Sequence, residues 1–280
     1  MISIIICSRT STISKDLSEN IKNTVGCVYE LIVIDNSDNT YSIFEAYNIG
    51  IERSKEDFVC FIHDDIFFHT KNWGSIVQDI FEQNKKLGLL GVAGAKSKTK
   101  MPSAWWDCPE ADKVLYLKQH LRNGSIEDWN LGFRDKNLKK VVAIDGVFMI
   151  ARRDKRFRFQ EALKGFHCYD LNISFEYIKL GYEIMVSNLI LVEHFSLGKL
   201  DKNWYLSTLQ MHKLYSNTLP LKTKESIVCK DFEFINGTNF IKGLFFFRYK
   251  KEAFLLWLQL IVVKPISRYH FKFMKEILSN

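Results

Sequence analysis

The segment Phe58-Val59-Cys60-Phe61-Ile62-His63-Asp64-Asp65 decides the expected fold class of this chain of 280 residues. Its five apolar residues, rich in β-formers, predict a strand buried on both faces, as in a parallel sheet. Two carboxylates and an imidazole follow at the carboxyl end of the strand, where ligands bind in open α/β sheets. Neighbouring carboxylates repel each other unless a cation or a proton offsets their charge, and oxygen ligands suit Mg²⁺ or Mn²⁺. The segment therefore predicts a metal-assisted enzyme that acts on a diphosphate-containing substrate.

The overall composition is that of a globular protein, with 47% hydrophobic and 25% charged residues. A chain of this length forms one large domain or two modest lobes. The apolar start of the chain lacks the basic region of a signal peptide and is expected to form the first core strand. The cysteines form no C-x-x-C pair, which predicts reduced thiols in the cytoplasm and argues against a zinc site or a disulfide framework. They are Cys7, Cys27, Cys60, Cys108, Cys168 and Cys229.

The net charge of +7 is concentrated at the carboxyl end of the chain. Residues 241–280 contain eight Lys or Arg and two Glu, which leaves about +1 for the preceding 240 residues. The body of the protein is therefore nearly neutral. This distribution argues against a nucleic-acid-binding protein, which would carry a basic patch or stripe on its body.

The hydrophobic pattern of the first hundred residues alternates between strands and helices. Repeated β-α-β units of this kind predict a parallel, right-handed, three-layer sheet. The pattern fades over 96–140 and returns as a strand over 141–150, interrupted by Asp145-Gly146, a helix over 170–180 and a strand over 184–192. The last eighty residues have helical character. In the first hundred residues, strands are expected at 2–7, 29–34, 58–62 and 87–95, and helices at 13–25, 44–51 and 73–81.

Several short motifs occur in an order that resembles one enzyme family. They are the opening strand Ser3 to Arg9, Ile32 to Ser37, Asn48-Ile49-Gly50, His63-Asp64-Asp65, Tyr169-Asp170 and Val192-Glu193-His194. They resemble GT-A glycosyltransferases of the inverting family 2 type. The first two segments resemble the nucleotide-binding start of that family. The other four resemble, in this order, its N-x-G, its D-x-D metal motif, its E-D element and its downstream His. The resemblance covers roughly residues 1–200. Two positions depart from the pattern, because His63 replaces the first Asp of D-x-D and Tyr169 replaces the Glu before the base.

The resemblance implies a GT-A fold, with a Rossmann-like mixed sheet flanked by helices. Residues 1–200 would form the glycosyltransferase domain, with a nucleotide-binding half over 1–100 and an acceptor-binding half over 101–200. Residues 201–280 would form a helical, basic and aromatic extension. The implied activity is a metal-dependent inverting transfer of a sugar, from a nucleotide-sugar that is expected to be UDP-linked. The acceptor would be a glycan or a lipid-linked glycan in surface polysaccharide synthesis.

The resemblance also implies roles for residues on the donor side. Asp65 and His194 would hold Mn²⁺ or Mg²⁺ against the donor diphosphate, whereas His63 is a second-shell or a structural residue. These candidates have simpler alternatives: a helix-capping or turn residue for Asp65, an Asx-turn for Asp35, and an exposed position for His194. The residues implied in binding the nucleotide-sugar are Ser8, Arg9, Asp35, Asn48 and Asp64.

On the acceptor side, Asp170 is the candidate general base. An inverting transfer needs one carboxylate to take the proton of the acceptor hydroxyl while that oxygen attacks the anomeric carbon. The alternative for Asp170 is an N-cap of the helix that follows it. Asp145 would line the acceptor side or mark a β-bulge, and Trp105 and Trp106 would stack on sugars or pack in the core.

The carboxyl-terminal apolar run 253–263 has basic residues on both sides. At about eleven residues it is too short to span a membrane, which takes roughly twenty. The sequence allows two interpretations of this run, and it does not specify the oligomeric state. One is an interfacial helix on the inner face of the cell membrane, making the protein a peripheral membrane enzyme through residues 241–280. The other is a core or oligomer-contact helix with a solvated basic rim.

Two other function classes remain to be weighed. A sugar nucleotidyltransferase shares the α/β sheet and metal-held phosphates, but it needs a Gly-rich basic loop after the first strand, and residues 8–12 contain no glycine. A non-catalytic nucleotide- or glycan-binding relative would explain the departures at His63 and Tyr169 as decay. The retained Asp65, Asp170 and His194 argue against it.

Overall fold

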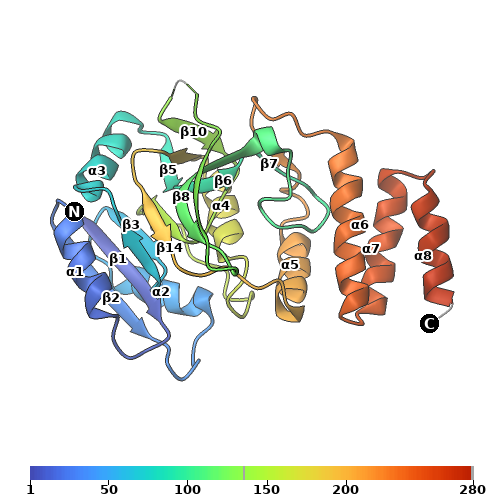
Figure 1. The fold of residues 1–280 in the computed structure, drawn as a ribbon, viewed down its shortest axis with the longest axis horizontal. Helices are drawn as coiled ribbons and strands as arrows, with labels where there is room; N and C mark the ends of the chain where they lie inside the picture. Colours follow the sequence, from blue (N-terminus) through green and yellow to red (C-terminus); the bar gives the residue numbers. More distant parts are fainter. Residues whose placement is uncertain (135, 279–280) are drawn as a thin grey trace.

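A computed structural model describes residues 1–134 and 136–278 of the chain. Its central feature is a mixed sheet of seven strands in the order β10-β13-β5-β12-β3-β1-β2 (Figure 1). The strands are β1 (Ile2–Ser8), β2 (Tyr29–Asp35), β3 (Phe58–Ile62), β5 (Leu87–Gly91), β10 (Leu138–Val141), β12 (Phe148–Arg152) and β13 (Glu183–Ser187). This mixed α/β arrangement confirms the predicted fold class.

The expected parallel pairing is right for β1, β2 and β3 and for β5 with β13, and it is wrong for β12 and β10. β1 pairs in parallel with β2 and β3, so their carboxyl ends meet at one edge. β12 lies antiparallel between β3 and β5, and β10 lies antiparallel to β13. The reason is that β12 follows an excursion of the chain through a second sheet, and no β-α-β crossover precedes it.

The second sheet explains why the hydrophobic pattern fades over 96–140. Its order is β11-β6-β8-β14-β4, with β9 paired to β8. The strand predicted over 87–95 is in fact split between the two sheets, and the strand predicted over 184–192 is divided in the same way between β13 and β14. The outer strand β9 is mostly exposed and carries a polar sequence, which hides it from a hydrophobic pattern. The strands are β4 (Ile66–Phe68), β6 (Ala93–Ala95), β8 (Lys113–His120), β9 (Ile126–Leu131), β11 (Ala143–Ile144) and β14 (Val192–His194).

Helices α1 (Lys15–Thr24), α2 (Ile43–Arg53), α3 (Trp73–Gln83) and α4 (Tyr169–Lys179) belong to this part of the chain. Their starts follow ordinary capping chemistry, since the Ser14 side chain accepts from Leu17 and Ser42 forms a capping box with Glu45. Helix α2 packs on β1 and β2, and α4 packs on β5, β11 and β13. Together they bury one large hydrophobic cluster around the two sheets.

The carboxyl-terminal part is helical, with α5 (Lys202–Leu214), α6 (Lys230–Phe246), α7 (Lys250–Val263) and α8 (Arg268–Leu278). Figure 1 shows α6, α7 and α8 side by side at the end of the molecule remote from the N-terminus. These three helices build a second hydrophobic cluster with Met101, Ala104 and Trp204. Within the described residues, no helix has the length and apolar character needed to cross a membrane. A short ladder of β7 (Ser97–Lys98) and β15 (Leu221–Lys222) and the 3-10 turn Glu110–Asp112 complete the fold.

Gly50 in α2 shows how closely this helix approaches the sheet. A Cβ at this position would lie 2.4 Å from Cγ2 of Ile5, which is fully buried in β1. We therefore expect Gly50→Ala to destabilise the fold by about 1–3 kcal/mol through overpacking, although alanine is favoured in helices by up to ~1 kcal/mol. Chemical denaturation measures the difference. Asn23→Ala on the exposed side of α1 is the control, and equal stability of the two variants would contradict the close approach.

Candidate active site

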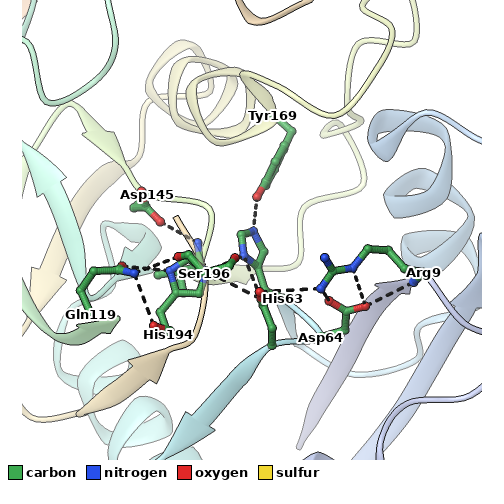
Figure 2. Close-up of polar contacts among 10 residues, drawn as sticks. Arg9, His63, Asp64, Gln119, Asp145, Tyr169, His194 and Ser196 are labelled. Atoms are coloured by element: carbon green, nitrogen blue, oxygen red, sulfur yellow. Dashed lines mark hydrogen bonds and ion pairs between the residues drawn. The ribbon is translucent and has the colours of Figure 1, made fainter. Parts of the chain in front are cut away.

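Three side chains from the ends of two strands meet where the central sheet adjoins the second sheet. His63 and Asp65 follow β3, and His194 ends β14. Figure 2 shows His63 and His194 close to each other. The Nδ1 atom of His63 lies 3.2 Å from Nε2 of His194, and each of these atoms lies 3.7 Å from Oδ1 of Asp65. No other group of three His, Cys, Asp or Glu within the described residues places its ligand atoms this close together.

The geometry of this triad suits a divalent cation. Mg²⁺ and ions of similar size take octahedral ligands at about 2.1 Å, which puts neighbouring ligand atoms about 3.0 Å apart. The observed separations of 3.2–3.7 Å approach that value with little movement. Two imidazoles and one carboxylate would fill three positions and leave the others open to a ligand or to water. The sequence predicted that His63 supports the metal ligands or the fold, whereas the structure places it as close to Asp65 as His194 is.

The orientation of His194 leaves its Nε2 atom free to bind a cation. Its Nδ1 lies 3.0 Å from Oε1 of Gln119, while the Gln119 amide nitrogen donates to the backbone carbonyls of His120 and Ser196. Because Gln119 can then only accept from the ring, the proton of neutral His194 lies on Nδ1. Burial and the neighbouring His63 lower the pKa of His194. The imidazole is thereby kept neutral and able to coordinate near pH 7.

Tyr169 holds the other imidazole from the opposite side. Its hydroxyl lies 2.5 Å from Nε2 of His63. Burial raises the pKa of Tyr169 well above its ordinary value, so the phenol stays neutral. A Cβ on Gly146 would lie 2.2 Å from the Tyr169 hydroxyl, so only glycine allows the ring this position. The departure from the family pattern at Tyr169 is therefore matched by the departure at His63, since the two side chains bind each other.

Asp64 forms an ion pair with Arg9. The Arg9 guanidinium lies 2.7 Å from Oδ1 of Asp64 and 3.7 Å from Oδ2 of Asp65. Burial opposes the ionisation of Asp64, but the hydrogen bonds from Arg9 outweigh it and lower the pKa of this carboxyl. Arg9 thus brings a positive charge to the rim of the triad and offsets part of the repulsion between the two acids.

A cavity of about 310 Å³ opens beside this ion pair, at the ends of β1 and β3. Ser8, Arg9 and Asp64, three of the predicted donor residues, line it together with Asp65. Asp35 does not, because its carboxylate accepts two hydrogen bonds from Ser37 in an exposed Asx-turn, and these bonds lower its pKa. Its neighbour Asn36 lines the cavity instead, held by hydrogen bonds to both backbone groups of Tyr41.

Asn48 also lies apart from both cavities, which corrects its predicted place among the donor-binding residues. It is buried in α2, where its amide donates to the Phe159 carbonyl and to Glu161 and accepts from the Phe159 backbone N–H. Its polar atoms are therefore committed to the segment that precedes α4. The N-x-G resemblance at this point reflects packing, because Asn48 holds this segment and Gly50 lies against β1.

A larger cavity of about 890 Å³ adjoins the smaller one. Predicted residues from the acceptor side, Asp145, Trp105, Trp106 and Asp170, all line it. Both cavities share a boundary formed by His63, Phe166, Tyr169 and Ser196. The His63–Asp65–His194 triad therefore lies where the two cavities meet.

Asp170 lies in the first turn of α4, facing the larger cavity. Burial, followed by the charge of Asp145, raises its pKa to about 7. The alternative role as N-cap is wrong, because Cys168 occupies that position with a left-handed backbone (φ 66°) and without a side-chain cap. A carboxyl group poised near neutral pH is suited to take up a proton in a reaction.

Trp105 and Asp145 form a structural link in the cavity wall. Trp105 is buried and its indole N–H donates to Asp145 at 2.9 Å, while the other carboxylate oxygen of Asp145 accepts from the Val147 backbone N–H. Trp106 packs edge-on against Trp105 and remains 39% exposed. Of these three residues, Trp106 therefore offers the most accessible surface to a ligand.

Sequence reasoning missed several residues that this geometry brings to the site. His63 had a usable signal, because it stands two residues before Asp65, where D-x-D has its first Asp. Gln119 had none, since it lies in β8 and reaches His194 only through the pairing of β8 with β14. The aromatic residues Trp129 and Phe166 of the larger cavity likewise lay in stretches without a motif.

Comparison with known proteins agrees with this architecture. The model of a family described as "Glycosyltransferase like family" matches residues 3–220. The structure of GalNAc-T7 with UDP, GalNAc and Mn²⁺ is similar with a TM-score of 0.50 and 9% identity, over 80% of this chain. The structure of S. aureus TarS 1-349 with UDP-GlcNAc is similar with a TM-score of 0.50 and 11% identity, over 93% of this chain and 79% of that one.

At these identities the likeness concerns the fold, which is that of GT-A glycosyltransferases. The chain spans about half of GalNAc-T7, covering 52% of its length. A search of curated proteins found no match.

The triad predicts a measurable affinity for Mn²⁺. We expect Asp65→Asn, His63→Gln and His194→Gln each to weaken Mn²⁺ binding by at least about tenfold, since each removes a ligand, and loss of an outer-shell partner alone costs 10- to 100-fold. Electron paramagnetic resonance of free Mn²⁺ measures the affinity. Asp57→Asn, at the opposite, exposed end of β3, is the matched control. Equal affinity of all four variants would show that the ion binds elsewhere or that none binds.

Proposed function

The chain belongs to the glycosyltransferase-like family whose model matches it, and from that premise we propose a metal-dependent, inverting transfer of a sugar from a UDP-sugar to a glycan or lipid-linked acceptor. One observation carries the proposal. The His63–Asp65–His194 triad lies at the boundary of two cavities, and the larger of them contains a carboxyl group with a pKa of about 7, that of Asp170.

We assign the nucleotide-sugar to the smaller cavity. Ser8, Arg9 and Asn36 line it at the ends of the parallel strands β1 and β2 or directly after them, the edge where α/β sheets bind nucleotides. Arg9 adds positive charge beside the place proposed for the diphosphate. The two solved structures named above contain UDP or UDP-GlcNAc, which supports UDP as the nucleotide.

His63, Asp65 and His194 would hold Mn²⁺ or Mg²⁺ in this arrangement. When bound, the ion would supply positive charge to the diphosphate of the departing nucleotide. The two imidazoles make this donor set softer than the all-oxygen sets that Mg²⁺ prefers, which favours Mn²⁺. The Mn²⁺ in the GalNAc-T7 structure supports the same choice.

Asp170 is the proposed general base. It would take the proton of the acceptor hydroxyl as the acceptor oxygen forms its bond to the anomeric carbon. The bond from that carbon to the diphosphate oxygen breaks at the same time, and the nucleoside diphosphate leaves from the opposite face. One displacement from the opposite face inverts the anomeric configuration. A base with a pKa near 7 combines a large ionised fraction at neutral pH with useful basicity.

We assign the acceptor to the larger cavity. Trp106, Trp129 and Phe166 line it, and aromatic rings of this kind stack on the apolar faces of sugars. Its volume of about 890 Å³ is near the upper end of the 300–1,000 Å³ typical of small-ligand sites, which suits a glycan of more than one sugar. Such an acceptor fits the synthesis of a surface polysaccharide.

The general-base role predicts a specific pH dependence. Below about pH 7 Asp170 is protonated and cannot accept a proton, so kcat/KM should rise as pH increases and level off above pH 7. Asp170→Asn should lower kcat by about 10²- to 10⁴-fold and abolish this rise. A pH profile of UDP release from each protein makes the measurement. An unchanged profile in Asp170→Asn would assign the base to another residue.

The same variant provides its own folding control. The pKa of Asp170 is higher in the fold than its ordinary value of 3.8, so its contribution to stability is lost as pH rises through about 7. Asp170→Asn should therefore raise the Tm at pH 8 and leave it almost unchanged at pH 4. Lost activity together with a raised Tm would separate a catalytic defect from unfolding.

Thermal unfolding with nucleotides tests the donor. We expect UDP with Mn²⁺ to raise the Tm by several degrees, because a ligand at 100 times its Kd adds about 2.7 kcal/mol. GDP, CDP and dTDP should give smaller shifts, and Asp65→Asn should lose the shift that Asp57→Asn retains. Release of UDP from a UDP-sugar then separates an enzyme from a non-catalytic binding relative. No shift with any nucleotide would overturn the donor assignment.

A further inference from the structure

Helix α7 is apolar on nearly all sides, yet only one of its faces is covered. Ala253, Leu256, Trp257 and Leu260 pack into the second hydrophobic cluster, where the Trp257 ring stacks on Phe273 of α8. The opposite side carries Phe254, Leu255, Leu258 and Val262, which we call the α7 stripe. These residues are 38–81% exposed. A helix that is apolar all round is normally buried, so the α7 stripe needs a covering partner.

Neither neighbouring helix covers the α7 stripe. Figure 1 shows α6 on one side of α7 and α8 on the other, at the end of the molecule remote from the N-terminus. The turn after α7 extends the apolar surface, because Ile266 is 93% exposed. All three helices follow the end of the family match at residue 220. This surface is therefore separate from the features that carry the proposed transfer, and its function does not depend on that proposal.

Positively charged side chains lie on the same face of α7 as the stripe and on an exposed face of α8. Lys251, Leu255, Leu258 and Val262 follow one another at the spacing i, i+4, i+7 and i+11, which places Lys251 on the same face of α7 as the stripe. On α8, the exposed Phe271 stands on one face with the exposed residues Arg268 and Lys272. Exposed apolar groups combined with Lys and Arg are the mark of a helix that lies in the interface of an anionic membrane.

Charge and length favour a lipid surface over a second copy of the chain. In a two-fold contact, the same patch of each copy would face the other and bring like charges together, at a cost in binding energy. An anionic leaflet instead attracts those charges. With 14 residues, α7 is only about 21 Å long, too short for the roughly 30 Å hydrocarbon core, so a membrane-bound α7 would lie in the plane of the membrane.

We propose that α7, through Phe254, Leu255, Leu258 and Val262, docks the protein on an anionic lipid surface, with Lys251, Arg268 and Lys272 contacting the headgroups. The apolar side chains would enter the boundary between headgroups and acyl chains. The basic side chains would remain at the level of the phosphates. The helices α6 and α8 hold α7 in place by the face opposite to the stripe.

Co-sedimentation with vesicles tests this surface. We expect the full chain to bind vesicles of phosphatidylglycerol and phosphatidylcholine, and to bind phosphatidylcholine alone at least about tenfold more weakly. The double variant Leu258→Glu/Val262→Glu and the triple variant Lys251→Gln/Arg268→Gln/Lys272→Gln should each weaken binding to the anionic vesicles at least about tenfold. Added salt should weaken the remaining binding.

The control is Val28→Glu, which places a charge at a 66% exposed valine of the main body and should bind vesicles like the parent. All changed positions are exposed, so each variant should keep the parent Tm and nucleotide response. No binding of the parent to anionic vesicles, or equal binding by all variants, would overturn the proposal. Light scattering that finds a dimer, dissociated by Leu258→Glu/Val262→Glu, would also overturn it and identify a second copy as the partner. Failure of the nucleotide assay alone would leave the lipid proposal standing.

Discussion

The register of β14 between β4 and β8 is the constraint on which the site depends. It pairs His194 with Ile66, one residue past Asp65, on one side and with Gln119 on the other. Because side chains alternate along a strand, a slip of one residue would turn His194 away from Asp65 and bring Glu193 in its place. In the observed register Glu193 lies on the other face of the sheet and binds His69 and His120. The triad is therefore the product of a pairing between strands more than one hundred residues apart.

The carboxylates near the triad need partners that offset their negative charge, and Arg9 and Trp105 are two of them. Six carboxylates line the two cavities, and Asp64, Asp65, Asp145 and Asp170 are the four that the proposed reaction involves. Arg9 satisfies the first, and hydrogen bonds from Trp105 and Val147 satisfy Asp145. Within the described residues, Asp170 has backbone hydrogen bonds from the start of α4 and the charge of Lys98 to compensate it, but burial outweighs them and its pKa remains high. A bound cation and a proton-accepting step are the two processes that such an arrangement favours.

The parts of this structure that could be predicted from sequence are those in which neighbouring residues act together. The apolar run Phe58–Ile62 forms a buried strand, and the acids after it lie at its carboxyl end, because strand and turn are local features. The antiparallel insertion of β12 and the reach of Gln119 to His194 depend on distant strands and leave no periodic signal. Asn48 shows the opposite error. A short motif suggested that Asn48 contacts the ligand. Because a buried amide without hydrogen-bond partners is costly, the Asn48 side chain instead forms hydrogen bonds with the Phe159 backbone.

Helix α5 packs in both hydrophobic clusters and thereby fixes the position of the carboxyl-terminal helices relative to the larger cavity. Its Met211 belongs to the main core, whereas its Trp204 packs with α6. Tyr215, directly after α5, also lies in the main core and accepts a hydrogen bond from Asn172 of α4, two residues beyond Asp170. Trp204 and Thr208 of the same helix line the larger cavity. A membrane that binds α7 would therefore also orient the wall of the larger cavity through α5. Under the two proposals, docking on the membrane would place this cavity in a fixed position relative to a lipid-linked acceptor.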